Sequence, residues 1–167
     1  VSGNNIYAGT SGGGVFLSTN NGDSWTQKNS GLTNTFISTL AISGNNIFAG
    51  INEVGVFLST DNGESWTKKN SGLTDTKIHL LAISGNNIFT VTLFKGVFLS
   101  TDNGDSWTEK NSGLTNTRVN TFAISGDNIF AGTWGGGLFL STDNGDSWTE
   151  KNSGLTDTVV SKLAING

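Results

Sequence analysis

The chain has 167 residues, a net charge of −4 with nine Lys and Arg, no cysteine, and a hydrophobic fraction of 34%. So few basic residues argue against a nucleic-acid-binding surface, which needs clustered Lys and Arg. No apolar run approaches the roughly 20 residues that cross a bilayer. Disulfides and thiolate metal sites are excluded by the absence of cysteine. We therefore expect neither nucleic acid nor a membrane as a partner, and no cofactor.

Four near-copies of a 41-residue unit account for the chain, as the spacing of Trp25, Trp66, Trp107 and Trp148 shows. A fixed period of this length is typical of repeat architectures, in which each unit is one supersecondary motif. The four units leave no segment for a second domain. We expect a single domain over residues 1–167.

The predicted elements are short strands separated by turns rich in Gly, Asn, Asp and Ser. In chain order, the first strands fall at residues 6–8 and 15–17, and the unit that follows opens with a strand at 37–42. The next unit predicts strands over 77–83, 87–92, 96–101 and 106–110. The last predicted strand, 159–165, repeats the opening strand of a unit. Each unit is therefore interpreted as a four-stranded antiparallel sheet.

Apolar residues occupy both parities of these strands, as in Val15, Phe16 and Leu17. A sheet with two apolar faces must be covered on both sides, which favours blades packed radially in an all-β β-propeller over a linear solenoid, the alternative. The chain starts at the second strand of a unit and ends with a first strand. We expect a composite closing blade that combines the N-terminal strands with the C-terminal strand.

The segment Ser59-Thr-Asp-Asn-Gly-Glu-Ser-Trp66 and its counterparts resemble the Asp-box of the BNR-repeat family, Ser-x-Asp-x-Gly-x-x-Trp. That resemblance implies a propeller and a structural hairpin between the third and fourth strands of each blade. Its proteins include sialidases, other glycoside hydrolases, sorting-receptor ectodomains, photosystem assembly factors and many secreted proteins, and we expect a secreted or cell-surface location. The residues expected to hold the hairpins are Asn20, Asp61, Asp102 and Asp143 with Trp25, Trp66, Trp107 and Trp148.

A calcium role for the three Asp residues is the alternative, although the loop lacks the full ligand ladder of an EF-hand. We expect no metal. Asn20 departs from the Asp-box pattern, yet its amide can still cap the turn.

Positions that differ between the copies are those that the shared fold does not dictate. They cluster in the connection between the second and third strands and at the start of the first strand, and both connections fall on one face of a four-stranded blade. The candidate binding residues on this face are Trp134, Phe94, Glu53, Lys95, Phe36, Lys77, His79 and Arg118. The alternative is that these positions drifted after duplication. Large apolar residues in Gly-rich loops favour a glycan or protein ligand.

Enzymatic activity is not expected. A sialidase-like site needs three arginines, whereas the chain has one Arg and one Tyr. Glycoside hydrolysis needs two opposed carboxylates, and Glu53 stands alone. We interpret the chain as a non-enzymatic binding or structural scaffold, as a repeat fragment or engineered array whose main property is folding and assembly. The alternative is a lectin-like carbohydrate-binding propeller.

Two ways of closing the ring follow from the order of the strands. A monomer could join its own ends into four blades, or a two-fold dimer could exchange the last strand and form eight. Unpaired strand edges promote association. We favour the homodimer, because rings that resemble this one usually have more than four blades.

Overall fold

The computed structural model describes residues 5–166, which form fifteen β-strands and no helix. In this range there is accordingly no helix that could cross a membrane. The strands group into four antiparallel sheets, here called the first to fourth blades.

The strands of each blade follow one another in chain order. The first blade contains β1 (Ile6–Thr10), β2 (Gly14–Ser18) and β3 (Thr26–Gln27). The second contains β4 (Ile37–Ser43), β5 (Asn46–Ile51), β6 (Gly55–Ser59) and β7 (Thr67–Lys68). The third contains β8 (Ile78–Ser84), β9 (Asn87–Thr92), β10 (Gly96–Ser100) and β11 (Thr108–Glu109). The fourth contains β12 (Val119–Ser125), β13 (Asn128–Thr133), β14 (Leu138–Ser141) and β15 (Thr149–Glu150).

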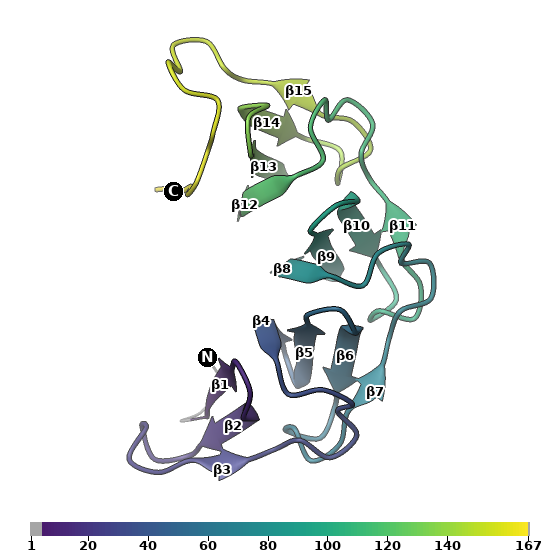
Figure 1. Ribbon diagram of the computed structural model, residues 1–167, viewed down its shortest axis with the longest axis vertical. Coiled ribbons are helices and arrows are strands. Elements are labelled where there is room, and N and C mark those ends of the chain that lie inside the picture. The colour runs from purple at the N-terminus through teal and green to yellow at the C-terminus, as the bar shows by residue number, and fades with distance from the viewer. Residues whose placement is uncertain (1–4, 167) are drawn as a thin grey trace.

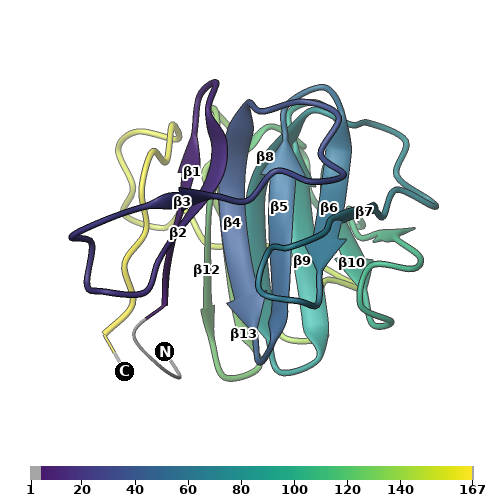
Figure 2. The same cartoon turned by 90° about the horizontal axis from the view of Figure 1, so that it is seen from below.

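The blades stand side by side along an arc, with β4, β8 and β12 on its inner side and β7, β11 and β15 outside (Figure 1). Seen from below, the strands of neighbouring blades stack face against face (Figure 2). Each blade is a meander in which consecutive strands pair antiparallel. The all-β propeller architecture and its four repeated units are confirmed.

Burial explains why the residues on both faces of these strands are apolar. Every residue of β6 is buried, and in β5 only the first residue is partly exposed. Phe57 belongs to a core shared with the first blade, through Val15, whereas Phe48 belongs to a core shared with the third, through Phe98. Adjacent side chains of one strand point to opposite faces, so each blade contributes to two cores.

The outermost strand is shorter than the sequence predicts. The expected strand 106–110 is reduced to the two residues of β11, because the preceding Trp107 is hydrogen-bonded to another blade. The Trp107 backbone N–H donates to Ser71 O of the second blade at 2.8 Å instead of pairing within its own sheet. The prediction of a five-residue outer strand was therefore wrong.

The arc does not close within one chain. The first blade has three strands, and the inner position beside β1 has no strand from residues 5–166. Of the predicted strand 159–165, Val159 forms an isolated bridge with Trp134, and residues 160–166 have no strand assignment. This segment lies beside the fourth blade, away from β1 (Figure 1). The composite blade is thus not formed within this single chain, because the C-terminal segment does not reach the edge that it would pair with.

Each junction between blades is made by the same three contacts. The indole of one blade donates from Nε1 to a Lys carbonyl of the preceding blade, in the pairs Trp66 to Lys28 (2.8 Å), Trp107 to Lys69 (2.9 Å) and Trp148 to Lys110 (2.9 Å). The amide of the same Trp donates to Ser30, Ser71 or Ser112 of the preceding blade. The Lys side chains pair with Glu64, Asp105 and Asp146, respectively. Successive blades are therefore joined by hydrogen bonds as well as by apolar packing.

A glycine makes this close approach possible. Gly113 has φ +89°, and a Cβ there would collide with the Trp148 carbonyl oxygen. Gly126, in a turn of the fourth blade, also has a positive φ of +57°, but a Cβ there would meet nothing within 4 Å. Substitutions at these two positions therefore separate the energetic cost of backbone strain from the cost of a clash at the junction.

We expect Gly113→Ala to lower the free energy of unfolding by about 2–4 kcal/mol, since overpacking adds to the cost of the left-handed backbone. Gly126→Ala should cost only about 1 kcal/mol, the left-handed term alone. Urea denaturation of both variants measures the difference. Equal losses would show that the Gly113 junction is not tightly packed.

Candidate functional site

The repeated turn between the third and fourth strands is held by its own polar side chains. Asp61 Oδ1 accepts from Ser59 Oγ at 2.8 Å and from the Ser65 amide at 2.9 Å, while Oδ2 accepts from Ser65 Oγ at 2.5 Å. Ser59 Oγ in turn accepts from the Gly63 amide at 2.8 Å. Asp102 and Asp143 repeat this arrangement. Both carboxylate oxygens are thus engaged by the turn.

These donors lower the pKa of each carboxyl group. The Ser65 hydroxyl, followed by the Ser65 amide and the Ser59 hydroxyl, lowers the pKa of Asp61 to about 2. The corresponding serines lower the pKa of Asp102 and Asp143 to about 2. In the first turn, Asn20 Oδ1 keeps the contacts with Ser18 Oγ (2.9 Å) and the Ser24 amide (3.0 Å). An amide can therefore replace the carboxylate in this turn.

The variable loops do lie on one face, opposite the repeated turns. In the third blade, the Leu93 amide donates to Lys77 O at 2.9 Å, and in the fourth the Trp134 amide donates to Arg118 O at 2.9 Å. Each pair joins the loop after the second strand to the residue before the inner strand. The two variable clusters of the sequence are thus one surface.

A first group on this face combines charge with an aromatic ring. Lys77 Nζ lies 3.4 Å from Glu53 Oε1 of the second blade and 5.3 Å from the centroid of the Phe94 ring. Phe94 is 52% exposed. The three residues come from two neighbouring blades and form a row across their junction.

A second group lines a hollow of about 170 Å³ between the third and fourth blades. It brings together three of the predicted residues, His79, Arg118 and Trp134. The Arg118 guanidinium lies 6.0 Å from the centroid of the Trp134 ring, which is 55% exposed. The remaining lining residues are Leu93, Val119 and Asn120.

Two predicted residues lie on the same face outside both groups. Phe36 is 46% exposed and bridges to Ser11 at the junction of the first two blades. Lys95 is exposed, and its backbone amide donates to Thr92 Oγ1 at 3.1 Å. Neither lines the hollow.

The predicted set of binding residues omitted several residues of this face. Leu93 and Asn120 belong to the variable clusters of the sequence but were not in that set. Val119 corresponds to Ile37 and Ile78, which are also apolar, so the comparison of the copies gave no signal for it. Asp75 was also missed, although its carboxylate accepts from the Lys77 amide at 3.0 Å and the Phe94 amide at 3.2 Å.

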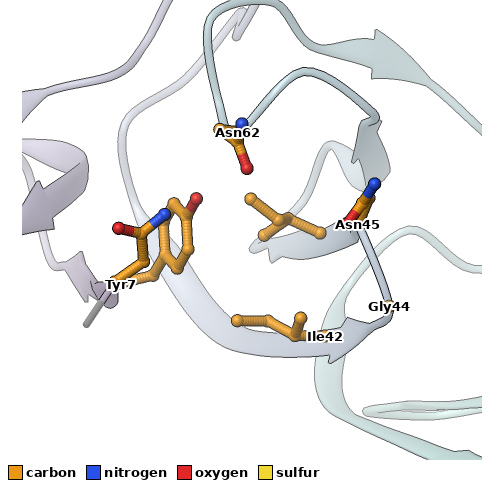
Figure 3. Close-up of a pocket in the computed structure, with 7 residues that line it drawn as sticks. Tyr7, Ile42, Gly44, Asn45 and Asn62 are labelled. Atoms are coloured by element: carbon orange, nitrogen blue, oxygen red, sulfur yellow. The ribbon is translucent and has the colours of Figure 1, made fainter. Parts of the chain in front are cut away.

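A larger hollow of about 460 Å³ opens on the opposite face, between the first two blades. Figure 3 shows Tyr7 of β1, Ile42 of β4 and Asn62 of the repeated turn around it. Burial raises the pKa of Tyr7 above its ordinary value. Phe48 and Phe89 replace Tyr7 in the following blades.

Comparison with known proteins identifies the family of the chain. The model of the DUF6242 beta propeller domain matches residues 1–114. The chain belongs to this family. Among curated proteins, none matches the sequence.

Solved structures with the same fold include both designed and natural proteins. The chain superposes over 100% of its length on 51% of the computationally designed Ika8 protein, at 14% identity and a TM-score of 0.76. It covers 23% of an ancestral GH74 enzyme with 90% of its own length, at 24% identity and a TM-score of 0.73. It covers 50% of YCF48 bound to D1 peptide with 87% of its length, at 15% identity and a TM-score of 0.66. The chain thus spans between about a quarter and a half of the length of these proteins, and its likeness to them shows the fold alone.

The depressed pKa values predict a pH dependence for the repeated turns. A carboxyl group whose folded pKa is near 2 and whose ordinary value is 3.8 stabilises the fold at pH values above 3.8. This contribution is lost as the pH falls through the range between these values. We expect the melting temperature of the wild type to fall more steeply between pH 4 and about pH 2 than that of a triple variant with Asp61→Asn, Asp102→Asn and Asp143→Asn.

Asp127→Asn is the matched control, since Asp127 is exposed and its counterpart in the second blade is Asn45. Its melting curve should follow the wild type over the same pH range. Parallel pH profiles for the wild type and the triple variant would contradict a role for these carboxylates in the acid stability of the turns.

Proposed function

We propose that this domain is a non-enzymatic scaffold that presents a binding face on one side of its blades. The observation that supports this most directly is that the repeated and the variable polar residues lie in different parts of the structure. The repeated polar residues are bound within the turns and the blade junctions, whereas the variable ones lie on one face, where His79 and Arg118 line a hollow together with Trp134. The ligand is then selected by residues that the fold does not require.

The environment of the acidic residues on this face supports a binding role over hydrolysis. A glycoside hydrolase uses one carboxyl group as an acid and a second as nucleophile or base, on either side of the scissile bond. Glu53 is paired with Lys77, and Asp75 accepts hydrogen bonds from two backbone amides. Neither carboxylate faces the other across the hollow, because Glu53 and Asp75 do not line it.

Carbohydrate binding is the second candidate, and the exposed indole of Trp134 favours it. Sugar rings stack on an aromatic face, and the Arg118 guanidinium supplies hydrogen-bond donors beside it. The Asn120 side-chain amide already donates to Val160 O at 3.3 Å, and His79 Nε2 lies 3.4 Å from Asn120 O. A peptide ligand could use the same aromatic side chains as anchors. The structural relative YCF48 binds D1 peptide, a peptide ligand on a related fold.

The resemblance of the repeated turns to the Asp-box motif supports a place for the domain in the Asp-box repeat family. It supports a secreted or cell-surface location in the same way. In this proposal the domain serves mainly by folding and assembling, as a repeat fragment or engineered array would, and the variable face adds recognition to that scaffold.

Trp134→Ala tests the binding face. Because Trp134 is more than half exposed, we expect the variant to keep its stability within about 0.5 kcal/mol, as surface substitutions usually do. A glycan array probed with the wild type should show binding that this variant loses at least about 30-fold, in line with the cost of removing an aromatic anchor. A bound sugar should also raise the melting temperature of the wild type.

Phe94→Ala is the matched control, since Phe94 is equally exposed but lies outside the hollow. It should retain the glycan that Trp134→Ala loses. No glycan binding at high concentration would remove the carbohydrate candidate, and release of reducing sugar from an array hit would overturn the non-enzymatic scaffold.

A further inference from the structure

The two ends of the arc carry the two halves of one blade junction. Each internal junction joins a repeated turn, through its Trp, to the Lys-Asn-Ser-Gly-Leu segment of the preceding blade. The three junctions inside the chain use the turns of the second, third and fourth blades. The turn of the first blade and the Lys-Asn-Ser-Gly-Leu segment of the fourth are left over, one at each end.

The turn of the first blade is exposed where its counterparts are covered. Trp25 is 43% exposed, whereas Trp66, Trp107 and Trp148 are 4–5% exposed. Within residues 5–166, Trp25 Nε1 makes no hydrogen bond, although its three counterparts all donate to a Lys carbonyl. A Cβ on Gly22 would touch only Trp25, while one on Gly63 would touch Lys28 of the preceding blade.

The segment that follows β15 carries the other half of a junction and lacks the turn that would pack against it. Lys151 is exposed and has no carboxylate partner among the described residues, whereas Lys28, Lys69 and Lys110 each have one. A Cβ on Gly154 would meet nothing within 4 Å, although one on Gly113 would collide with Trp148. Leu155 is 45% exposed, while its counterparts Leu32, Leu73 and Leu114 pack against the cores.

The inner edge of the first blade shows the same complementarity in its strands. β1 pairs with β2 along one edge and has no described strand along the other. Ile6 of β1 is 41% exposed, compared with 2% for Ile47 in the complete second blade. The 460 Å³ hollow lies near this edge, between Tyr7 and Ile42 (Figure 3). In the second blade, the inner strand β4 occupies the equivalent position beside β5.

We propose that a second copy of this chain occupies this end. Trp25 would insert against Lys151, Ser153 and Gly154 of that copy, as Trp66 inserts against Lys28, Ser30 and Gly31. Residues 160–166 of the second copy would form the inner strand of the first blade and fill part of the hollow. Figure 1 shows the two ends on opposite sides of the opening of the arc, which favours a second chain over closure of one chain. Two such contacts related by a two-fold axis close a ring.

The complete second blade gives the register of this strand. β4 pairs with β5 through Leu40 opposite Ala49 and Ala41 opposite Phe48. The equivalent pairs are Leu163 opposite Ala8 and Ala164 opposite Tyr7. Adjacent pairs in an antiparallel ladder alternate between wide and close spacing, so one of these two is the close pair.

The mass of the chain in solution is the first test. Light scattering should give twice the 17.4 kDa of one chain. Trp25→Ala should raise the dissociation constant of the dimer by at least about 30-fold per junction, as expected for a central aromatic contact. A wild-type mass of one copy, or of three or more, would overturn the two-copy ring.

Engineered disulfides supply a second test that does not depend on losing a contact. The sequence has no cysteine, so a variant with Ala8→Cys and Leu163→Cys, or one with Tyr7→Cys and Ala164→Cys, contains only the tested pair. Upon oxidation, the close pair should link two chains on a non-reducing gel.

Matched controls in the second blade are Leu40→Cys with Ala49→Cys and Ala41→Cys with Phe48→Cys, one of which should form a link within the chain. A disulfide within one chain in the test variants would show a closed four-bladed monomer and overturn the proposal. So would the absence of any link in both test variants when a control pair does form its disulfide.

Discussion

The insertion of one tryptophan into the preceding blade is the contact on which this architecture depends. A four-stranded blade of this size has apolar side chains on both faces and cannot bury them alone. The indole of Trp66 contributes to the core between the first two blades and also donates its N–H to the Lys28 carbonyl, so one side chain removes apolar area from water and satisfies a buried polar group. Each blade is completed by its neighbour, which makes stability a property of junctions more than of single units.

The junctions also determine which residues are free to vary. The polar residues of the repeated turn, such as Asp61 and Ser65, bind one another, and Asn70 holds the third strand by accepting from the Val56 amide and donating to the Val54 carbonyl. A replacement in these networks must keep their hydrogen-bonding groups, as Asn20 does in the first turn, or it leaves a donor or acceptor unpaired. On the opposite face, the repeated polar contacts reach backbone groups, as Asp75 does with the Lys77 amide, while side chains such as Phe94 and Trp134 are more than half exposed. Residues that differ between copies therefore collect there.

Much of this organisation was accessible from the sequence because the copies repeat it. The blade count, the role of the turns and the face that carries Phe94 and Trp134 all follow from which positions recur. What the sequence could not reveal are distances across junctions. The outer strand shrinks because Trp107 bonds to Ser71 in another blade. The grouping of Arg118 with Trp134, apart from Lys95, depends on loop conformations that the Gly-rich composition leaves open.

Near-identity of the units has a further physical consequence. Each blade carries a turn with a Trp on one side and the segment that receives such a turn on the other side, so every junction has the same complementary surfaces. A terminal blade without a neighbour therefore exposes a surface that is complementary to another copy of the blade. Trp25 is that surface here, since it is exposed only because no blade precedes it among the described residues. Open strand edges of this kind promote association unless they are covered. The rotation between adjacent blades then decides whether the contacts close into a ring or continue as an open array, because a head-to-tail interface admits only these two outcomes.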